Sequence, residues 1–364
     1  MSDSATTTTP TRWPLADGRE LLFFSLPDHI PAPTTDRRPL TAQHDQSELR
    51  FDRQTGQWIV VAALRQDRTH IPTLAECPLC PGPSGLTSEV PAPEYDVVVF
   101  ENRFPSLSGS GAPLPVPDTD GFVSAPGHGR CEVISFSSDH AGSFADLEPP
   151  HARLVVEAWR HRTADLMARP GIQQVFCFEN RGEEIGVTLT HPHGQIYGYP
   201  YLTPRTARMM DQARAHRTRH GTNLFADIVA QELADGARIV TRNDFFTAFV
   251  PFASRWPVEV HLYPNRWVRN LIELDDAELD AFAQTYLDVL RRFDRMYPTP
   301  LPYISALHQY RDTDAQREGC FHVELISIRR AATKLKYLAS SESAMEAFIT
   351  DVTPEGVASR LREL

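Results

Sequence analysis

The chain has 364 residues, a length that favours about two domains or one large duplicated unit. Its apolar (41%) and charged (23%) fractions are those of a globular protein with a sizeable core. The formal net charge of −11 argues against a general binder of nucleic acid or of anionic membranes. No apolar run approaches the roughly 18 residues that a membrane span needs. The polar N-terminus has no apolar stretch of a secretory signal, so we expect a cytoplasmic protein.

In chain order, residues 1–45 are rich in Thr and Pro, and we expect them to be disordered or extended. The first predicted strand is the apolar run at 56–62, and further strands are expected at 95–100, 131–136 and 173–178. Between the last two, apolar residues at helical spacing predict an amphipathic helix that begins near Pro149. These residues are Ala152, Val155, Val156, Trp159, Leu166 and Met167.

The sequence also resembles itself. A shift of 127 residues places Glu132 on Glu259, and it places the helix near Pro149 on a second helix that begins near Ala277. Asp275, with an acidic residue three positions later, is typical of a capping box for that second helix. We therefore predict an α+β fold of two duplicated halves, with antiparallel sheets packed with helices. The halves are expected at residues 46–204 and 205–364.

The densest chemical segment is His-Pro-His-Gly-Gln at 191–195, and a related spacing recurs at 322–324. In an extended chain His191 and His193 project to the same side, because side chains alternate along a strand. The proline restricts the backbone between them, and the glycine lets a substrate approach closely. A neutral imidazole attacks phosphorus and leaves again, so it can divide a nucleotidyl transfer into two easier steps. The segment therefore favours a nucleophilic histidine beside a phosphate over a chance pair of histidines.

Cys77 and Cys80 have a spacing that is common in zinc sites. The spacing also occurs in redox pairs, but those need a thioredoxin-like βαβ context, which the Pro-rich residues after Cys80 do not provide. The five cysteines contain no second CxxC, and we expect no disulfide framework in a cytosolic chain. A zinc site would therefore take two histidines from elsewhere, and the candidates are His70, His128, His140 and His191.

No Walker A or GxGxxG pattern is present, which argues against P-loop and Rossmann sites. A phosphate would then need a few well-placed cations. Arg65 and Arg68 lie three positions apart just after the first predicted strand, and Lys334 and Lys336 alternate near a late strand. Without further context, each of these residues is best interpreted as a solvated charge.

Taken together, several segments resemble galactose-1-phosphate uridylyltransferases, a branch of the histidine-triad superfamily. They extend from about Arg50 to the C-terminus and read TGQWIVVA, CPLC, FENRFP, SFSSDH, FENRGEEIGVTLTHPHGQIYGYP and LKYLASSES. In this family each half of the chain is a histidine-triad-like unit, which agrees with the duplication.

The resemblance implies a ping-pong exchange of UMP between UDP-glucose or UDP-galactose and hexose 1-phosphates such as galactose 1-phosphate, the Leloir pathway of galactose metabolism. It makes His193 the nucleophile, which would form a covalent uridylyl-imidazole. Gln195 occupies the place where histidine-triad hydrolases carry a third histidine. A glutamine can bind phosphoryl oxygens but cannot deliver a proton, so we expect transfer to another phosphate rather than hydrolysis.

The resemblance also assigns the other site residues. Structural zinc would be bound by Cys77, Cys80, His140 and His191. The uridine nucleotide and its phosphates would be contacted by Arg65, Arg68, Asn102, Asn180, Gln195 and Thr188. The hexose phosphate would be contacted by Lys336, Tyr337 and Glu342. We expect a homodimer and no nucleic-acid or membrane partner.

Some family members bind a second metal through a glutamate and three histidines of the second half. Here His308 and His322 match, but Glu324 takes the third histidine position and Met209 takes the place of the glutamate. We therefore do not expect a second metal. Two alternative functions stay open: a nucleotide-sugar or dinucleoside-polyphosphate phosphorylase of the same superfamily, and a non-catalytic nucleotide-binding protein.

Overall fold

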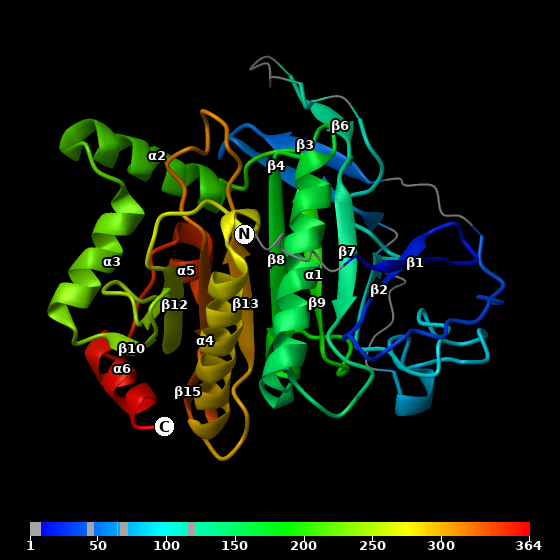
Figure 1. The fold of residues 1–364 in the computed structure, drawn as a ribbon. Coiled ribbons are helices and arrows are strands. Elements are labelled where there is room, and N and C mark those ends of the chain that lie inside the picture. The colour runs from blue at the N-terminus through cyan, green and yellow to red at the C-terminus, as the bar shows by residue number, and fades with distance from the viewer. Residues whose placement is uncertain (1–8, 42–46, 64, 66–71, 112, 116–120) are drawn as a thin grey trace, which may run out of the picture. The chain divides into compact units, whose positions relative to one another are not determined.

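The computed structural model describes residues 9–41, 47–63, 65, 72–111, 113–115 and 121–364 (Figure 1). The chain forms two compact units. Unit 1 comprises residues 1–142, 154–177 and 191–210, and unit 2 comprises residues 143–153, 178–190 and 211–364. Both units combine helices with antiparallel strands, which confirms the predicted α+β class. No helix of the described residues has the length and apolar character that a bilayer span requires.

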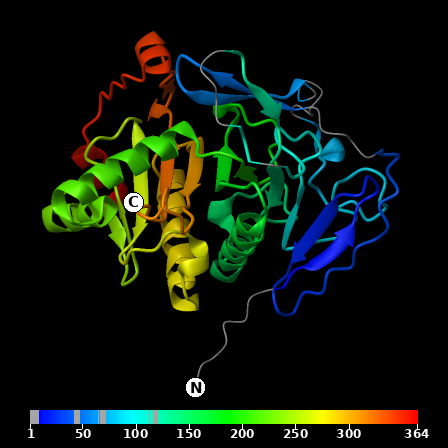
Figure 2. The same cartoon turned by 90° about the horizontal axis from the view of Figure 1, so that it is seen from above.

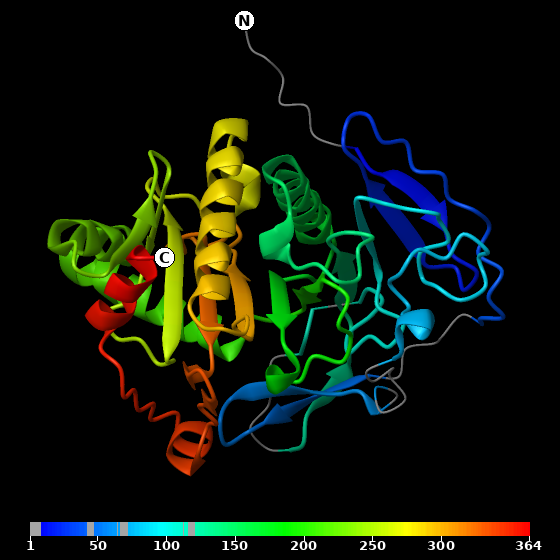
Figure 3. The same cartoon turned by 90° about the horizontal axis from the view of Figure 1, so that it is seen from below.

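The main sheet of unit 1 has its strands in the order β1-β2-β5-β7-β9-β8. Their bounds are Thr11–Pro14 (β1), Glu20–Phe24 (β2), Val97–Glu101 (β5), Arg130–Ser135 (β7), His193–Tyr199 (β9) and Gln174–Arg181 (β8). A separate small sheet, visible at the lower edge of Figure 3, has the order β4-β3-β6. Its strands are Gln57–Val61 (β4), Glu48–Asp52 (β3) and Ser124–Pro126 (β6). Helix α1 (Pro149–Ala168) packs beside β7, where the ring of Trp159 meets Phe136, the residue after the strand, edge to face.

The N-terminal segment contains two paired strands. Residues 1–45 are expected to be disordered or extended, but β1 and β2 form an antiparallel pair and β2 also pairs with β5. Each residue of the run 21–24 is at most 3% exposed. This run is apolar on both faces, so it lacks the alternation that identifies a half-buried strand, and Thr- and Pro-rich flanks surround it. The predicted strand at 56–62, observed as β4, is therefore not the first one.

The sheet of unit 2 has the order β13-β14-β12-β11-β10. Its strands are Tyr303–His308 (β13), His322–Ser327 (β14), Val258–Pro264 (β12), Phe246–Phe249 (β11) and Ile239–Arg242 (β10). Helix α4 (Asp276–Arg295) packs on one face, where Phe282 meets Phe246 and Phe321. Helix α3 (Leu224–Asp235) packs on the other face, where Phe225 lies against Tyr263 and His322 (Figure 2).

The remaining elements are short or peripheral. The helices are Pro204–His220 (α2), Ser340–Met345 (α5) and Pro354–Arg362 (α6), and a two-stranded ribbon joins Arg329–Ala331 (β15) to Lys334–Leu335 (β16). Single 3₁₀ turns are found at Leu74–Glu76 (η2), Phe144–Asp146 (η3), Glu183–Ile185 (η4) and Leu271–Glu273 (η5).

The helices confirm the predicted duplication. Helix α1 and helix α4 have the same length, and their bounds differ by the predicted 127 positions, as do those of η3 and η5. Asp275 and Glu278 form the capping box expected for α4. Each half orders its strands in the same way, β5-β7-β9-β8 in the first half and β11-β12-β14-β13 in the second.

The strands of the two halves correspond at a sequence offset that differs from the 127 positions relating the helices. Glu132 of β7 lies on the face covered by α1, where Arg162 donates two hydrogen bonds to it. Glu259 of β12 lies on the face away from α4, because the register of β11 with β12 places Phe246, the partner of Phe282, on the opposite side. A shift of one residue turns a side chain to the other face of a strand, so the predicted match of Glu132 with Glu259 is wrong by one position. The predicted match of residues 191–193 with residues 322–324 agrees with the strand register, because His193 and Glu324 lie on corresponding faces of their sheets.

The compact units are discontinuous in sequence, and the predicted division between residues 204 and 205 stays a prediction. Residues 143–153 belong to unit 2, because Arg291 of α4 donates to the carbonyl oxygens of Ala145 and Leu147. Residues 178–190 belong to the same unit, where Glu179 accepts a hydrogen bond from Tyr303. These contacts join residues more than 120 positions apart, and periodicity within a segment carries no information about them.

Candidate active site and metal centre

Two cysteines and two histidines of unit 1 meet as the resemblance implies. Cys77 and Cys80 follow the short η2 turn, His140 lies in the loop after β7, and His191 lies just before β9. One ligand atom from each lies within 4.8 Å of the others. The Nδ1 atom of His191 is 3.8 Å from Cys77 Sγ and 3.6 Å from Cys80 Sγ, and His140 Nδ1 is 3.3 Å from Cys80 Sγ. His70, the other early candidate, lies outside the described residues, and His128 is not part of this group.

The four ligand atoms fit a tetrahedral zinc ion. Zinc–sulfur bonds of about 2.3 Å and zinc–nitrogen bonds of about 2.0 Å place sulfur and nitrogen about 3.6 Å apart, close to the three observed distances. Burial, together with the neighbouring Cys77, raises the pKa of Cys80 to about 12. The Cys80 thiol is therefore protonated until a cation displaces its proton, so metal binding at this group would release a proton.

The second ring nitrogen of His191, Nε2, also has hydrogen-bonding partners. Its Nε2 donates to the carbonyl oxygen of Ser137 at 2.8 Å and lies 3.1 Å from the hydroxyl of Tyr95. The same hydroxyl lies 2.6 Å from the carbonyl oxygen of Leu79, inside the CxxC loop, and 2.9 Å from Ser135 Oγ. Such outer partners orient a metal-binding imidazole. No sequence signal identified Tyr95, which connects three segments of the chain through one oxygen.

His193 begins β9 and is held by its own backbone neighbour. Its Nδ1 donates to the carbonyl oxygen of His191 at 2.7 Å. This contact keeps the proton on Nδ1 and leaves the lone pair on Nε2. Burial lowers the pKa of His193, so the ring is neutral at physiological pH. The ring therefore has the tautomer and the charge that a nucleophile needs.

Gln195 and Tyr197 follow His193 on the same face of β9. Half-buried and buried residues alternate along this strand, and the residues at 193, 195, 197 and 199 are the half-buried ones. The hydroxyl of Tyr197 donates to Gln195 Oε1 at 3.1 Å. Strand alternation from His193 would have identified Tyr197 in the sequence.

Arg65 and Asn102 both form hydrogen bonds with the backbone of Phe104. The carbonyl oxygen of Phe104 accepts a hydrogen bond from Arg65 Nη1 at 3.1 Å, and its N–H donates to Asn102 Oδ1 at 2.9 Å. Both side chains are half-buried in unit 1. Arg68 lies outside the described residues.

Asn180 and Thr188 belong to unit 2. Asn180 lies near the end of β8, and Thr188 lies in the loop that follows η4; both are half-buried. Their predicted roles at the nucleotide stay predictions.

Lys336 and Glu342 meet, but they do so as a buried ion pair. Lys336 Nζ lies 2.7 Å from Glu342 Oε1 and donates to the carbonyl oxygens of Arg255 and Ile349. These three partners match the three N–H bonds of an ammonium group. The neighbouring Tyr337 is 73% exposed. In this chain the pair holds the late segment in place, and contact with a hexose phosphate stays a prediction.

A second group that could hold a metal lies in unit 2. Its members are His308, His322 and Glu324, all buried, with ligand atoms within 4.8 Å of one another. His261 also approaches, with Nε2 3.9 Å from Glu324 Oε1. Burial opposes the charge of Glu324, but the imidazoles around it outweigh burial and hold its pKa well below 4.5. The prediction of no second metal depends on a count of ligands along the chain without gaps. The three side chains that this count finds, His308, His322 and Glu324, do lie together in the structure.

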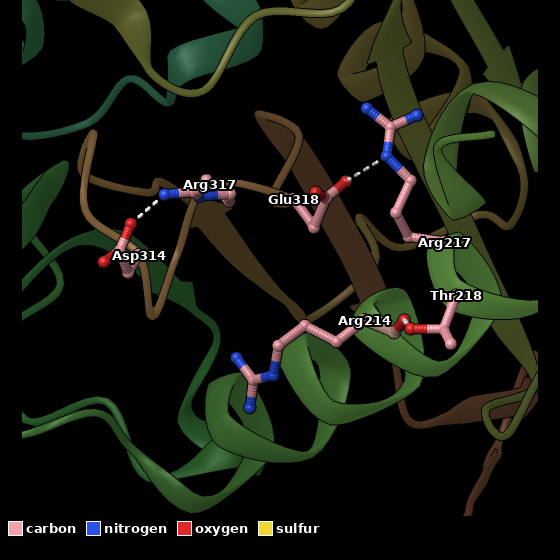
Figure 4. Close-up of a pocket in the computed structure, with 6 residues that line it drawn as sticks. All are labelled: Arg214, Arg217, Thr218, Asp314, Arg317 and Glu318. Atoms are coloured by element: carbon pink, nitrogen blue, oxygen red, sulfur yellow. Dashed lines mark hydrogen bonds and ion pairs between the residues drawn. The ribbon is translucent and has the colours of Figure 1, made fainter. Parts of the chain in front are cut away.

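A surface hollow of about 400 Å³ lies elsewhere in unit 2, between α2 and the loop before β14. Its polar lining is Arg214, Arg217, Thr218, Asp314, Arg317 and Glu318. Figure 4 shows Arg317 paired with Asp314 and Arg217 paired with Glu318. No predicted site residue lines this hollow.

Comparison with known proteins places this chain in a family. Its residues 38–203 match the N-terminal domain of galactose-1-phosphate uridyl transferase, and residues 209–364 match the C-terminal domain. The chain belongs to the galactose-1-phosphate uridylyltransferase family. It is 44% identical over 363 residues to the enzyme of that name from Streptomyces lividans, covering 96% of each chain. It is 36% identical to the Thermotoga maritima enzyme, covering 87% of this chain and 98% of that one.

The fold comparison agrees. A solved structure described as a uridylyltransferase superposes with a TM-score of 0.77 at 32% identity, covering 87% of this chain and 98% of the other. The predicted α+β fold of two duplicated halves and the predicted enzyme class, a nucleotidyltransferase, are thereby confirmed. Uridylyl transfer between a nucleotide sugar and a hexose 1-phosphate is the activity of this family, and it agrees with the prediction.

Proposed function

We propose that this chain transfers UMP between UDP-glucose and galactose 1-phosphate through a covalent bond to His193. The observation that carries this proposal is the 2.7 Å contact of His193 Nδ1 with the carbonyl oxygen of His191, which leaves Nε2 as a free lone pair on a neutral ring. Family membership supports the uridylyl donor and the sugar-phosphate acceptor.

The reaction then consists of two similar displacements. The Nε2 lone pair attacks the α-phosphorus of UDP-glucose, a P–N bond forms, and the bond from that phosphorus to the oxygen of glucose 1-phosphate breaks. The leaving group departs with the electron pair as a phosphate and needs no proton. A phosphate oxygen of galactose 1-phosphate next attacks the same phosphorus, the P–N bond breaks, and Nε2 recovers its lone pair. UDP-galactose leaves.

Gln195 favours this outcome over hydrolysis. It stands on the same face of β9 as His193, where its amide can donate to the phosphoryl oxygens of the intermediate. An amide does not take a proton from water as an imidazole does, so water attacks the intermediate slowly. The intermediate therefore persists until a second phosphate binds.

Other residues would bind the substrates. We assign the nucleotide and its phosphates to Arg65 and Asn102, which share Phe104, together with Arg68, Asn180 and Thr188. We assign the hexose phosphate to the late segment, where Lys336 and Glu342 would shape the backbone that presents the exposed Tyr337.

The group of Cys77, Cys80, His140 and His191 would hold zinc in a structural role. A bound zinc ion supplies four fixed bonds that orient the loop before β9. His191 would then present its carbonyl oxygen to His193 in a constant position. A homodimer and a cytoplasmic location are further parts of this proposal.

Incubation with UDP-glucose alone tests the proposal. Wild-type protein should gain the mass of one UMP and release glucose 1-phosphate, and His193→Ala should do neither. The absence of an adduct on the wild type, or its persistence in His193→Ala, would overturn the proposal. His151→Ala, which changes a histidine outside the site, is the matched control and should be labelled like the wild type.

A panel of donors and acceptors separates the alternatives. A phosphorylase would use inorganic phosphate as the acceptor and accept ADP-glucose or diadenosine tetraphosphate as the donor. A non-catalytic nucleotide-binding protein would bind UDP-glucose without turnover. The proposal requires UDP-glucose as the donor and a hexose 1-phosphate as the acceptor.

A further inference from the structure

The hydroxyl of Tyr197 occupies a position between two residues of the proposed phosphate site. It donates to Gln195 Oε1 at 3.1 Å, and the side chains of Arg65 and Ser106 lie within hydrogen-bonding reach of the same phenol. Arg65 comes from the segment after β4, and Gln195 comes from β9. The phenol is therefore bonded to Gln195 and lies near the charge of Arg65, a residue 130 positions away from Gln195 in the sequence.

The ring that carries this hydroxyl is firmly held. Tyr197 packs on a buried apolar cluster of Leu49, Leu107 and Cys131. Its ring centroid lies 5.8 Å from that of Tyr199, which lies 5.7 Å from that of Tyr201. Because the ring has only two rotatable bonds and is packed on its apolar side, the hydroxyl has a nearly fixed position.

The direction of the hydrogen bonds around the phenol follows from the groups present. A guanidinium only donates, so Arg65 can approach the phenol only at a lone pair of its oxygen. Burial raises the pKa of Tyr197, so the phenol keeps its own proton at neutral pH. That proton is donated to Gln195 Oε1. The carbonyl end of the Gln195 amide is therefore engaged, and its NH₂ end is left to donate elsewhere on the His193 face of β9.

We propose that Tyr197 is a positioning residue that holds the amide of Gln195 with its NH₂ group toward the phosphoryl group transferred by His193. With the amide reversed, a carbonyl oxygen would face the negatively charged phosphoryl oxygens. The hydroxyl of Tyr197 disfavours this, because a reversed amide would remove the carbonyl oxygen that accepts the phenol proton. The inference rests on the proposed function, in which Gln195 binds the intermediate.

The test is Tyr197→Phe, which removes one oxygen and keeps the ring. Single-turnover uridylylation of His193 by UDP-glucose should slow about tenfold, the effect of one lost hydrogen bond to a reacting group. The KM for UDP-glucose should change less than about twofold, because Arg65 and Asn102 keep their hydrogen bonds with the Phe104 backbone. The melting temperature should stay within about 3 °C of the wild type. A full wild-type rate in Tyr197→Phe would overturn the inference.

A double-mutant cycle identifies the residue through which Tyr197 acts. In a Gln195→Ala background, Tyr197→Phe should cause less than about a twofold further loss, because the amide that it orients is gone. A further tenfold loss in that background would overturn the inference. The inference would also fail if Tyr197→Phe were coupled to Arg65→Ala and not to Gln195→Ala. Tyr199→Phe is the matched control: it is the next ring on the same face, and no hydrogen bond of its hydroxyl is found within the described ranges.

The same experiment separates this inference from the proposed function. If the wild-type protein forms no UMP adduct, the proposed function fails before Tyr197 is tested. If the wild type is labelled and Tyr197→Phe is labelled at the same rate, the function stands and the role of Tyr197 is rejected.

Discussion

His193 Nδ1 lies 2.7 Å from the carbonyl oxygen of His191, and the ring of His191 faces the thiols of Cys77 and Cys80. The proposed nucleophile and the proposed zinc group therefore share one short backbone segment. Any change that releases the His191 ring also releases the oxygen that fixes the tautomer of His193. The metal group and the rate of uridylylation should consequently respond together.

The first prediction concerns that group. Cys80→Ser should lower the zinc content of the purified protein and its melting temperature. A metal present at about 100 times its Kd contributes about 2.7 kcal/mol to the free energy of unfolding, and the variant should lose about this much. Metal analysis and thermal unfolding of the same samples measure both effects. Cys320→Ser, a buried thiol outside the group, should keep the zinc content of the wild type. A wild-type zinc content in Cys80→Ser would reject these ligands.

The second prediction concerns the choice between transfer and hydrolysis. Gln195→His places an imidazole where an amide stands, and an imidazole can take a proton from water. The variant should release free UMP from UDP-glucose in the absence of a sugar phosphate, at a rate at least about tenfold above that of the wild type. Chromatography of the nucleotides measures this release. Gln195→Asn, which keeps an amide, should not gain hydrolysis, and equal hydrolysis by both variants would contradict the role given to Gln195.

The third prediction concerns the buried ion pair of Glu132 and Arg162, on the opposite face of the sheet from His193. Burial acts to raise the pKa of Glu132, but the guanidiniums of Arg162 and Arg130 outweigh it and hold the pKa below 4.5. The pair therefore contributes stability that is present above about pH 4.5 and is lost as the pH falls through the folded pKa. Glu132→Gln should lower the free energy of unfolding by about 3–5 kcal/mol at neutral pH.

Denaturant unfolding of Glu132→Gln and the wild type at neutral and acid pH measures this effect. The difference between the two proteins should shrink in acid, and a constant difference would contradict the assignment. The exposed pair of Arg50 with Glu48 provides the control, because Arg50→Gln should leave the stability almost unchanged.

The fourth prediction concerns Glu179. Burial raises the pKa of its carboxyl group to about 7 from 4.5, although the Tyr303 hydroxyl donates to it at 2.9 Å. Between these values the folded chain keeps a proton that the unfolded chain has released. The free energy of unfolding should therefore fall as the pH rises through this window, by about 3 kcal/mol.

Glu179→Gln is neutral at every pH, so it should lack this slope and be more stable than the wild type at about pH 8. Unfolding of both proteins by urea at about pH 5 and about pH 8 measures the slope. Parallel pH dependence in the two proteins would show that Glu179 is ionised throughout. Glu346→Gln, at an exposed acidic residue, is the control and should follow the wild type.

Local patterns in the sequence predicted the helices that are stabilised by interactions between residues close together in the sequence. The period of apolar residues identified α1 and α4, and the capping box identified where α4 begins, because helix side chains and caps interact within a few positions. The segment at 191–195 would place both histidines on one face if it were extended throughout. In the structure the strand β9 begins at His193 and carries Gln195 on the same face, and His191 lies before it.

Other features depended on contacts between distant residues. The sequence alone left four histidines open as zinc ligands, and the resemblance to a family selected two of them. The fold brings His140 and His191 to the thiols across 60 and 111 positions. The apolar run of β2 has no alternation because both of its faces are buried. The interpretation of Lys336 changes because three acceptors from separate parts of the chain surround its ammonium group. The sequence by itself determined helices α1 and α4, the position of His193 and Gln195 on one face of a strand, and the chemistry of these side chains. The tertiary structure alone decided which side chains share a metal, which face of a strand each occupies and which charges are neutralised, because these depend on through-space distances that sequence spacing does not measure.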